Sequence, residues 1–512
     1  MCRLRWSVTT AVVGCILVVV SCVISFVVVP NIIQDTIISE TVLLDDTIQL
    51  ERFIEVPFPL NFSVRIWNIS NPEEFLAGGV PHMDEIGPYV YRLYPLRNVT
   101  NMEEDVITYQ RIERFEFDAE ASYPLTENDY VSVINVPYHA IIQVAQVMFP
   151  TLAVLMDLAM DAIYGEFNSP VVTLPVQQLL FTGIPLCAGN VGNIGATACN
   201  LIREIGADLQ NLKLQDDGSL SFSVLNYKNE TPSKDFEVFR GLNDHRRLGE
   251  IITFNQSSYL SYWDDDTVSE VQEGPQVSVC NMINGTDASV YAPLVDTDKP
   301  VYALNTDICR SVELRYELDT EYDGVPVARF AANEWFLDND EGCFCLNVTT
   351  GINREDGCLL KGAMELYSCV GAFLVLSYPH FLFADERYKN GVTGLNPVEN
   401  DHKIFMDLEP NTGTPIRGFK RAQFNIFARA VEGISPTANI PTTLVPIFWV
   451  EEGLTLPEEL LDELRTRLLQ TLRLVDILIP VIIAVTAAIF LLGVILIIIA
   501  IRRKSTNKVF TT

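Results

Sequence analysis

The sequence predicts an α+β domain that lies between two membrane-spanning helices, one at each end of the chain. Residues 8–29 and 477–501 contain no charged side chain, and each run is longer than the roughly 20 residues that a helix needs to cross a bilayer. Between them, apolar and polar residues alternate in short stretches, which is typical of half-buried antiparallel strands. Residues 140–164 form a third apolar run, with helical spacing.

The first apolar run is long for a signal peptide. A signal-peptide core has about 7–15 residues, whereas residues 8–29 span 22 positions. The run ends in the bulky sequence Val27-Val28-Val29-Pro30 and not in a cleavage site of small residues. We therefore expect an uncleaved anchor, with a cleavable signal peptide as the alternative.

Basic residues flank both terminal runs on their outer sides. They are Arg3 and Arg5 before the first run, and Arg502, Arg503, Lys504 and Lys508 after the second. Positively charged flanks stay on the cytoplasmic side of a membrane. The expected topology is a cytoplasmic tail at 1–6, a transmembrane helix at 7–29, a lumenal or extracellular domain at 30–476, a transmembrane helix at 477–501 and a cytoplasmic tail at 502–512.

The domain between the two runs is strongly acidic. The tails contain 6 of the 35 Lys and Arg residues and none of the 66 Asp and Glu residues, so 29 basic residues remain against 66 acidic ones. A surface with this balance repels polyanions. The composition therefore excludes nucleic acid and an anionic membrane surface as partners of the domain as a whole.

Sequons and cysteines agree with a lumenal domain. Seven Asn-x-Ser/Thr sequons lie between the runs and none lies in the tails: Asn61, Asn68, Asn98, Asn229, Asn255, Asn284 and Asn347. Thiols in an oxidising lumen form disulfides. The cysteines between the runs are Cys187, Cys199, Cys280, Cys309, Cys343, Cys345, Cys358 and Cys369. We expect disulfides here, and a zinc site at Cys343 and Cys345 is the alternative.

Three further cysteines lie outside the domain. Cys15 and Cys22 fall inside the first apolar run, where we expect them to be inert. Cys2 lies beside the membrane on the cytoplasmic side, where palmitoylation and a free thiol are both compatible with the sequence.

The third apolar run predicts two short helices. Pro150 would break the run, and the acids Asp157 and Asp161 argue against a third membrane span. The apolar residues along one face of each helix are candidate ligand contacts: Ile141, Val144, Val147 and Met148 in the first, and Leu152, Leu155 and Met156 in the second. The helices are either a buried layer or a cap with an exposed apolar patch. No Lys or Arg occurs from Phe115 to Ile202, so we expect no cationic contact in this region.

Strands account for most of the remaining domain. We expect a β-rich segment at residues 30–135 and a strand at 220–224 after the turn Asp217-Gly218. Residues 312–318 alternate in the same way, and the turn Asp323-Gly324 then leads into a partner strand.

The sequence contains no catalytic or metal-binding pattern. The five histidines have no paired metal-ligand spacing: His82, His139, His245, His380 and His402. Gly189, Gly192 and Gly195 lack the Lys-Ser/Thr of a phosphate loop, and we expect an ordinary loop there. We therefore predict that the protein is not an enzyme and that it needs no metal or cofactor.

Several stretches together carry a resemblance to a known family. They are Asn71–Gly79 with Gly87–Tyr91, Cys280–Asp287, Asp307–Ser311, the cysteines from Cys343 to Cys369, Pro379–Ala384, and Gly394–Pro397 through Glu409–Gly413 to Lys420–Gln423. In this order, with an anchor at each end, the chain resembles the class B scavenger receptors, the family of fatty acid translocase and lysosomal integral membrane protein. Cys187, Cys199 and residues 412–415 are similar to arthropod branches, including the sensory neuron membrane proteins and epithelial membrane protein.

The resemblance implies a fold and a ligand class. The fold would be an antiparallel β-barrel crossed by a lipid-sized tunnel, with a helical apex at residues 139–180. The implied disulfides are Cys280–Cys343, Cys309–Cys369 and Cys345–Cys358. The implied ligands are lipids of the fatty acid, sterol, carotenoid or pheromone class.

The predicted function is that of a cell-surface receptor that takes up lipids and passes them through the domain to the membrane. The alternatives are a protein-binding, sorting or adhesion receptor that uses the apex, and a co-receptor for lipid pheromones. Relatives that bind anionic lipoproteins carry apical lysines, which this chain lacks. The acidic Leu-Ile-type sorting signal of the lysosomal relative is absent from residues 502–512, which favours the plasma membrane over endosomes and lysosomes.

Overall fold

The computed structural model of the protein describes residues 2–148, 153–189, 191–263, 279–338 and 343–509. The chain forms two compact units. The first contains both chain ends and consists of Met1–Val42, Glu321–Pro326 and Leu456–Thr512. The second, called the ectodomain below, consists of Leu43–Thr320 and Val327–Thr455.

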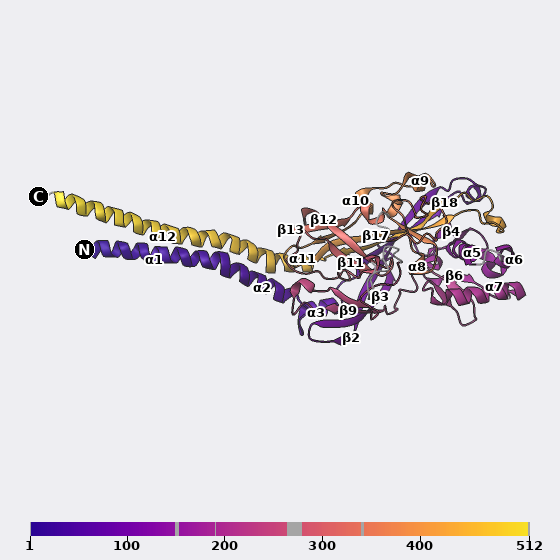
Figure 1. The fold of residues 1–512 in the computed structure, drawn as a ribbon, viewed down its shortest axis with the longest axis horizontal. Coiled ribbons are helices and arrows are strands. Elements are labelled where there is room, and N and C mark those ends of the chain that lie inside the picture. Colours follow the sequence, from indigo (N-terminus) through magenta and orange to yellow (C-terminus); the bar gives the residue numbers. More distant parts are fainter. Residues whose placement is uncertain (1, 149–152, 190, 264–278, 339–342, 510–512) are drawn as a thin grey trace, which may run out of the picture. The chain divides into compact units, whose positions relative to one another are not determined.

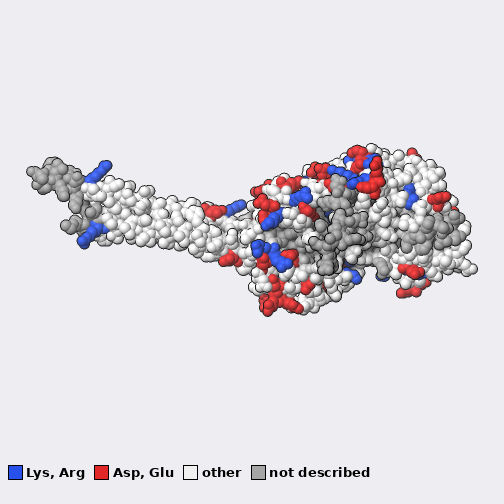
Figure 2. Space-filling model, in the orientation of Figure 1, with Lys and Arg blue, Asp and Glu red and all other residues white. Residues whose placement is uncertain are grey.

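The first unit is built from two long helices. The N-terminal helix comprises α1 (Cys2–Val23), a π-helical turn (Ile24–Val28) and α2 (Val29–Thr41). The C-terminal helix comprises α11 (Glu458–Leu464), a second π-helical turn (Arg465–Leu469) and α12 (Gln470–Val509). Among the described residues, these two helices, over Arg5–Thr41 and Glu458–Arg502, are long and apolar enough to cross a membrane. Figure 2 shows that their middle portions carry no charge.

The two long helices pack closely against each other. Figure 1 shows α1 and α12 side by side, with both chain ends at the same end of the pair. Small residues allow this approach, because a Cβ at Gly14 would collide with Phe490 and a Cβ at Gly493 would collide with Ala11. The hydroxyl groups of Ser21 and Thr486 also form a hydrogen bond of 3.1 Å across the pair.

A 13-stranded sheet forms the centre of the ectodomain. Its main path runs β10-β9-β3-β2-β1-β18-β17-β16-β13-β12-β11. The strands are β1 (Leu60–Ile69), β2 (Met83–Met102), β3 (Val106–Phe117), β9 (Asp235–Phe239), β10 (Ile251–Phe254), β11 (Val301–Asn305), β12 (Arg310–Tyr322), β13 (Val325–Ala332), β14 (Met364–Glu365), β15 (Leu374–Ser377), β16 (Ile404–Leu408), β17 (Pro415–Ala428) and β18 (Thr443–Thr455). The predicted α+β class, with an antiparallel sheet and two terminal apolar helices, is confirmed. The described strands pair along an open path and not around a closed barrel.

Smaller elements surround this sheet. Two small sheets comprise β4 (Tyr130–Ile134) with β5 (Val171–Pro175), and β6 (Ile184–Leu186) with β7 (Leu212–Leu214) and β8 (Leu220–Phe222). The helices are α3 (Ile48–Ile54), α4 (Pro72–Leu76), α5 (Val136–Met148), α6 (Ala153–Tyr164), α7 (Gly192–Ile205), α8 (Tyr367–Val370), α9 (Glu386–Lys389) and α10 (Glu399–His402). Four disulfides join Cys187 to Cys199, Cys280 to Cys343, Cys309 to Cys369 and Cys345 to Cys358.

Two local predictions, the β-rich segment at 30–135 and the loop at Gly189–Gly195, were wrong in part. Residues 29–41 continue the first helix and β1 begins only at Leu60, because a helix that already exists extends without the cost of a new nucleus. The expected loop at Gly189–Gly195 is in part helical, since α7 begins at Gly192. Gly195 is needed for packing between helices, because a Cβ there would collide with Ala162 of α6.

One short segment links the two edge strands of the main sheet. The amide of Ile251 in β10 donates to the carbonyl of Gly285 at 2.9 Å, and the amide of Leu304 in β11 donates to the carbonyl of Thr286 at 2.9 Å. Gly285 has a φ of +78°, and a Cβ there would collide with the carbonyl oxygen of Tyr302. This position therefore requires glycine for the sake of both its φ and the space around it.

We expect Gly285→Ala to disrupt the hydrogen bonds through which residues 285 and 286 link the two edge strands. The added methyl group has to displace the backbone of β11, so we expect a loss of stability of several kcal/mol. Gly218→Ala is the matched control, because Gly218 has a similar φ of +81° and open space around it; strain alone should cost about 1–2 kcal/mol. Thermal unfolding of the purified full-length chain measures both, and equal losses would show that the contact with Tyr302 is unimportant.

Candidate ligand site

Three helices gather at one end of the ectodomain, which is called the apex below (Figure 1). α5 and α6 are the two helices expected on either side of Pro150, and Pro150 itself lies outside the described residues. The third, α7, packs on α6 and is tied to the end of β6 by the disulfide between Cys187 and Cys199. The amide of Cys187 also donates to the carbonyl of Ile163 in α6 at 2.7 Å.

The inner side of α5 contains polar side chains. His139 and Gln143 are almost fully buried, and Gln146 lies one turn further along the same face. Gln143 Nε2 donates to the carbonyl of Phe427 in β17 at 3.0 Å, and Gln146 Oε1 accepts from Arg429 Nη2 at 2.6 Å. Side-chain hydrogen bonds therefore attach α5 to the end of β17. The apolar residues Tyr138 and Ile142 of α5 are buried as well, so polar and apolar side chains share the inner side of this helix.

The outer faces of the apex carry apolar side chains. Val147 in α5 is 53% exposed, Leu158 in α6 is 65% exposed and Ile194 in α7 is 53% exposed. Of the predicted ligand contacts, Ile141 and Val144 are half-buried. Met148, Leu155 and Met156 lie in α5 and α6, but their side chains are outside the described residues, as is Leu152 entirely. The apex thus combines a buried layer around Ile142, Met160 and Ile163 with an exposed apolar surface.

A buried cation lies at the apex, contrary to the sequence-based expectation. Arg429 follows β17 and is 8% exposed. Its Nη2 bonds Gln146, but its buried Nε has no hydrogen-bond acceptor. No carboxylate of the described residues lies within 4 Å of it, and burial lowers its pKa. The expectation was wrong because the cation comes from a segment 283 residues beyond Gln146.

Arg429 also affects the neighbouring histidine. Burial is the main cause that lowers the pKa of His139 to about 4; the hydrogen bond between its Nε2 and the carbonyl of Pro170 acts in the opposite sense, and the positive charge of Arg429 lowers the pKa further. His139 is therefore neutral at physiological pH. The inner side of α5 offers Arg429 only neutral partners.

A cluster of paired charges joins the main sheet to the segment before β12. Asp307 Oδ2 lies 2.8 Å from Lys228 Nζ and 3.1 Å from Lys420 Nζ, and Lys420 also pairs with Glu452 at 3.2 Å. Burial raises the pKa of Asp307, but the two lysines outweigh this effect and hold the pKa well below its ordinary value. The side chains of Lys228 and Asp307 keep 18% and 19% exposure although desolvation by surrounding protein is the largest effect on the pKa of both.

Aromatic side chains continue the same row of the sheet. Strand register places Glu452 of β18 opposite Phe62 of β1, Phe62 opposite Tyr91 of β2, and Tyr91 opposite Phe117 of β3. Directly paired residues share one face of a sheet, and Phe62 and Tyr91 are buried. The inner face of the sheet therefore changes from paired charges to aromatic rings within five strands.

Other groups singled out from the sequence have structural roles. His380 stacks on His402 with ring centres 4.2 Å apart, and its Nε2 lies 2.6 Å from a carboxylate oxygen of Glu85. Its Nδ1 accepts from the amide of Asn396, so Nε2 carries the proton that is donated to Glu85. The described residues contain no group of three His, Cys, Asp or Glu side chains that could hold a metal ion.

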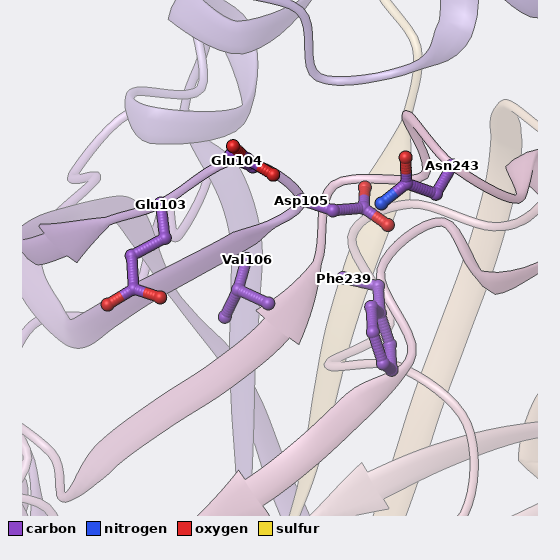
Figure 3. Close-up of a pocket in the computed structure, with 6 residues that line it drawn as sticks. All are labelled: Glu103, Glu104, Asp105, Val106, Phe239 and Asn243. Carbon is purple, nitrogen blue, oxygen red and sulfur yellow. The ribbon is translucent and has the colours of Figure 1, made fainter.

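A pocket of about 670 Å³ lies at the turn between β2 and β3 (Figure 3). Its lining consists of Glu103, Glu104, Asp105, Val106, Phe239 and Asn243. Three carboxylates in so small a lining repel an anionic head group. The amide of Leu242 already donates to Asp105, so this pocket is a poor candidate for the lipid site.

A large disulfide-bonded domain between two terminal candidate spans is the arrangement of a membrane protein that is anchored at both ends. A model of the CD36 family matches residues 12–497. The chain is 32% identical to sensory neuron membrane protein 2 of Drosophila melanogaster, over 93% of this chain and 94% of that protein. It is 30% identical to sensory neuron membrane protein 1 of Apis mellifera, over 87% of this chain and 82% of that protein.

The chain therefore belongs to the CD36 family. This result confirms the resemblance found in the sequence motifs. The protein is a membrane receptor and not an enzyme, and family membership implies ligands of lipid type.

We expect the ectodomain to lose stability in mild acid because His139 must gain a proton when it unfolds. Its pKa of about 4 in the folded state lies below the unfolded value of about 6.5. The contribution is complete above pH 6.5 and falls by about 3 kcal/mol as the pH drops to 4. In His139→Gln the amide can keep the bond to Pro170, so its thermal unfolding should depend less on pH across this window. The exposed His82, as His82→Gln, is the control, and an unchanged pH profile for His139→Gln would contradict the assignment.

Proposed function

We propose that the protein is a cell-surface receptor that binds lipid ligands at the apex and transfers them through the ectodomain to the membrane. The observation that carries this proposal is the exposed apolar surface of the apex, where Val147 of α5, Leu158 of α6 and Ile194 of α7 face solvent. An apolar surface without a protein cover favours an apolar ligand, because burial of each CH2 group contributes about 0.8 kcal/mol.

The interior supports a passage for such a ligand. The sheet's edge strands are linked through Gly285 and Thr286, which is the arrangement that a barrel-like wall around a tunnel requires. Paired charges and aromatic rings face inward from this wall. Transfer needs no catalytic residue, because the ligand only moves from one apolar environment to another.

The membrane topology belongs to the same proposal. Both tails, 1–6 and 502–512, would be cytoplasmic, with spans at 7–29 and 477–501 and the domain at 30–476 outside, including a helical apex at 139–180. The antiparallel packing of α1 and α12 supports it, because both chain ends lie at the same end of the helix pair. Palmitoylation of Cys2 would add a further anchor on the cytoplasmic side.

A role in sensory neurons is the second candidate. Relatives over most of the chain are sensory neuron membrane proteins, and the ligand would then be a lipid-like pheromone handed to a second receptor. A receptor whose apex docks a protein partner is the remaining alternative, because the same apolar surface suits both.

We expect Val147→Asp and Leu158→Asp to weaken lipid binding by the full-length chain. Each change places a charge on the exposed apolar surface, and loss of roughly 1 kcal/mol of apolar contact lowers the affinity about fivefold. Ile48→Asp is the control, because Ile48 is as exposed as Val147 but lies in α3. Binding of tritiated palmitic acid to the chain in nanodiscs, with empty nanodiscs as the blank, measures the effect. If neither the wild type nor any variant binds the lipid, the proposed function is rejected.

We expect N-linked glycans at sequons with exposed asparagines if the domain lies outside the cytoplasm. Asn61, Asn98, Asn255 and Asn347 are exposed, whereas the side-chain carbonyl of Asn68 accepts from the amide of Ser132. Treatment of the cell-expressed chain with a peptide N-glycosidase should lower its mass and convert occupied sites to Asp, which peptide mass spectrometry reads. A chain without any glycan in eukaryotic membranes would contradict the topology.

A further inference from the structure

We propose that Arg429 binds the carboxylate of a long-chain amphiphile beneath helix α5. The proposal rests on the proposed function, since it names the ligand end group that the apex recognises. The guanidinium lies against the inner face of α5, where its Nη2 donates to Gln146 and its buried Nε has no acceptor among the described residues.

Other buried arginines of the ectodomain show what Arg429 lacks. Arg97, Arg240 and Arg421 are as deeply buried as Arg429. Each donates to a carboxylate, at 2.7 Å to Asp287, 2.5 Å to Asp45 and 2.7 Å to Glu451, respectively. A buried charge without a partner is costly, and native proteins pair it or bind a ligand to it. Arg429 therefore lacks the carboxylate partner that each of these three arginines has.

The surroundings select the chemistry of the missing partner. His139 is neutral and Gln146 is uncharged, so the ligand has to supply the negative charge. A carboxylate matches the planar guanidinium and can use both the free Nε and a second nitrogen in one plane. The exposed apolar side chains of Val147 and Leu158 lie in α5 and α6, so a long acyl chain attached to the carboxylate would find apolar contacts at the apex.

Matched ligands test the proposal without any change to the protein. Palmitic acid, methyl palmitate and hexadecanol have closely similar chains and differ in the end group. We expect the wild-type chain in nanodiscs to bind palmitic acid at pH 7.4 at least about tenfold more tightly than the other two, because a charge-assisted bond to a buried guanidinium is much stronger than a neutral one. Equal affinity for the three compounds would overturn the carboxylate site and leave the proposed function intact. Failure of all three to bind would reject the proposed function itself.

Variants assign the effect to Arg429. Arg429→Met keeps the length of the side chain and removes its charge, so it should lower the affinity for palmitic acid to that for methyl palmitate and leave the ester unchanged. Arg247→Met, at an exposed arginine, should retain the preference for the acid. Retention of that preference by Arg429→Met would place the carboxylate elsewhere.

Stability separates a ligand site from a structural role. Without ligand, Arg429→Met should unfold at the same or a higher temperature than the wild type, because an unpaired buried charge has been removed. Palmitic acid should raise the unfolding temperature of the wild type more than that of the variant. A strongly lowered unfolding temperature for the ligand-free variant would mean that Arg429 is paired within the protein, which contradicts the proposal.

Discussion

The architecture of the ectodomain depends on buried charge pairs between the sheet and the disulfide-bonded segment. Asp287 follows Cys280 and pairs with Arg97 of β2, while Asp307 precedes Cys309 and pairs with Lys228 and with Lys420 of β17. Removal of one partner from a fully buried pair such as Arg97 and Asp287 costs roughly 3–5 kcal/mol. The disulfides fix the loops that carry the two aspartates, so the cross-links and the ion pairs act on the same segments.

This arrangement explains why the interior can remain polar in one part and apolar in another. The charges of Lys228, Asp307, Lys420 and Glu452 neutralise each other, so none of them requires a ligand. A lipid that moves along the inner face would meet aromatic rings of the same strand row without a strong charge to stop it. We therefore expect the ligand to bind more strongly at the apex, where the cation Arg429 lacks a carboxylate partner among the described residues.

The sequence predicts features that depend on neighbouring residues. The two terminal helices follow from uninterrupted apolar runs, and the turn at Asp323 and Gly324 follows from the need for positive φ at both positions. The candidate site was predicted less well. Exposure of Val147 follows from the pattern only if the inner face is known, and that face is set by Gln143 and Phe427, which are 284 residues apart. A polar face with two glutamines and a histidine was the available signal that α5 buries hydrogen bonds.

Arg429 is a second site residue that the local sequence could not predict. A stretch of 88 residues without Lys or Arg predicts an apex without cations only if each segment supplies its own charges. The end of a long strand can bring a residue from a distant part of the sequence to a helix, and Arg429, which directly follows β17, contacts α5 in this way. Arg429 has no carboxylate partner among the described residues. Its positive charge, which residues 115–202 do not supply themselves, is therefore the strongest recognition element at the apex. An apex with one buried cation favours a single carboxylate on an acyl chain over a multiply charged particle, which would need a cationic surface.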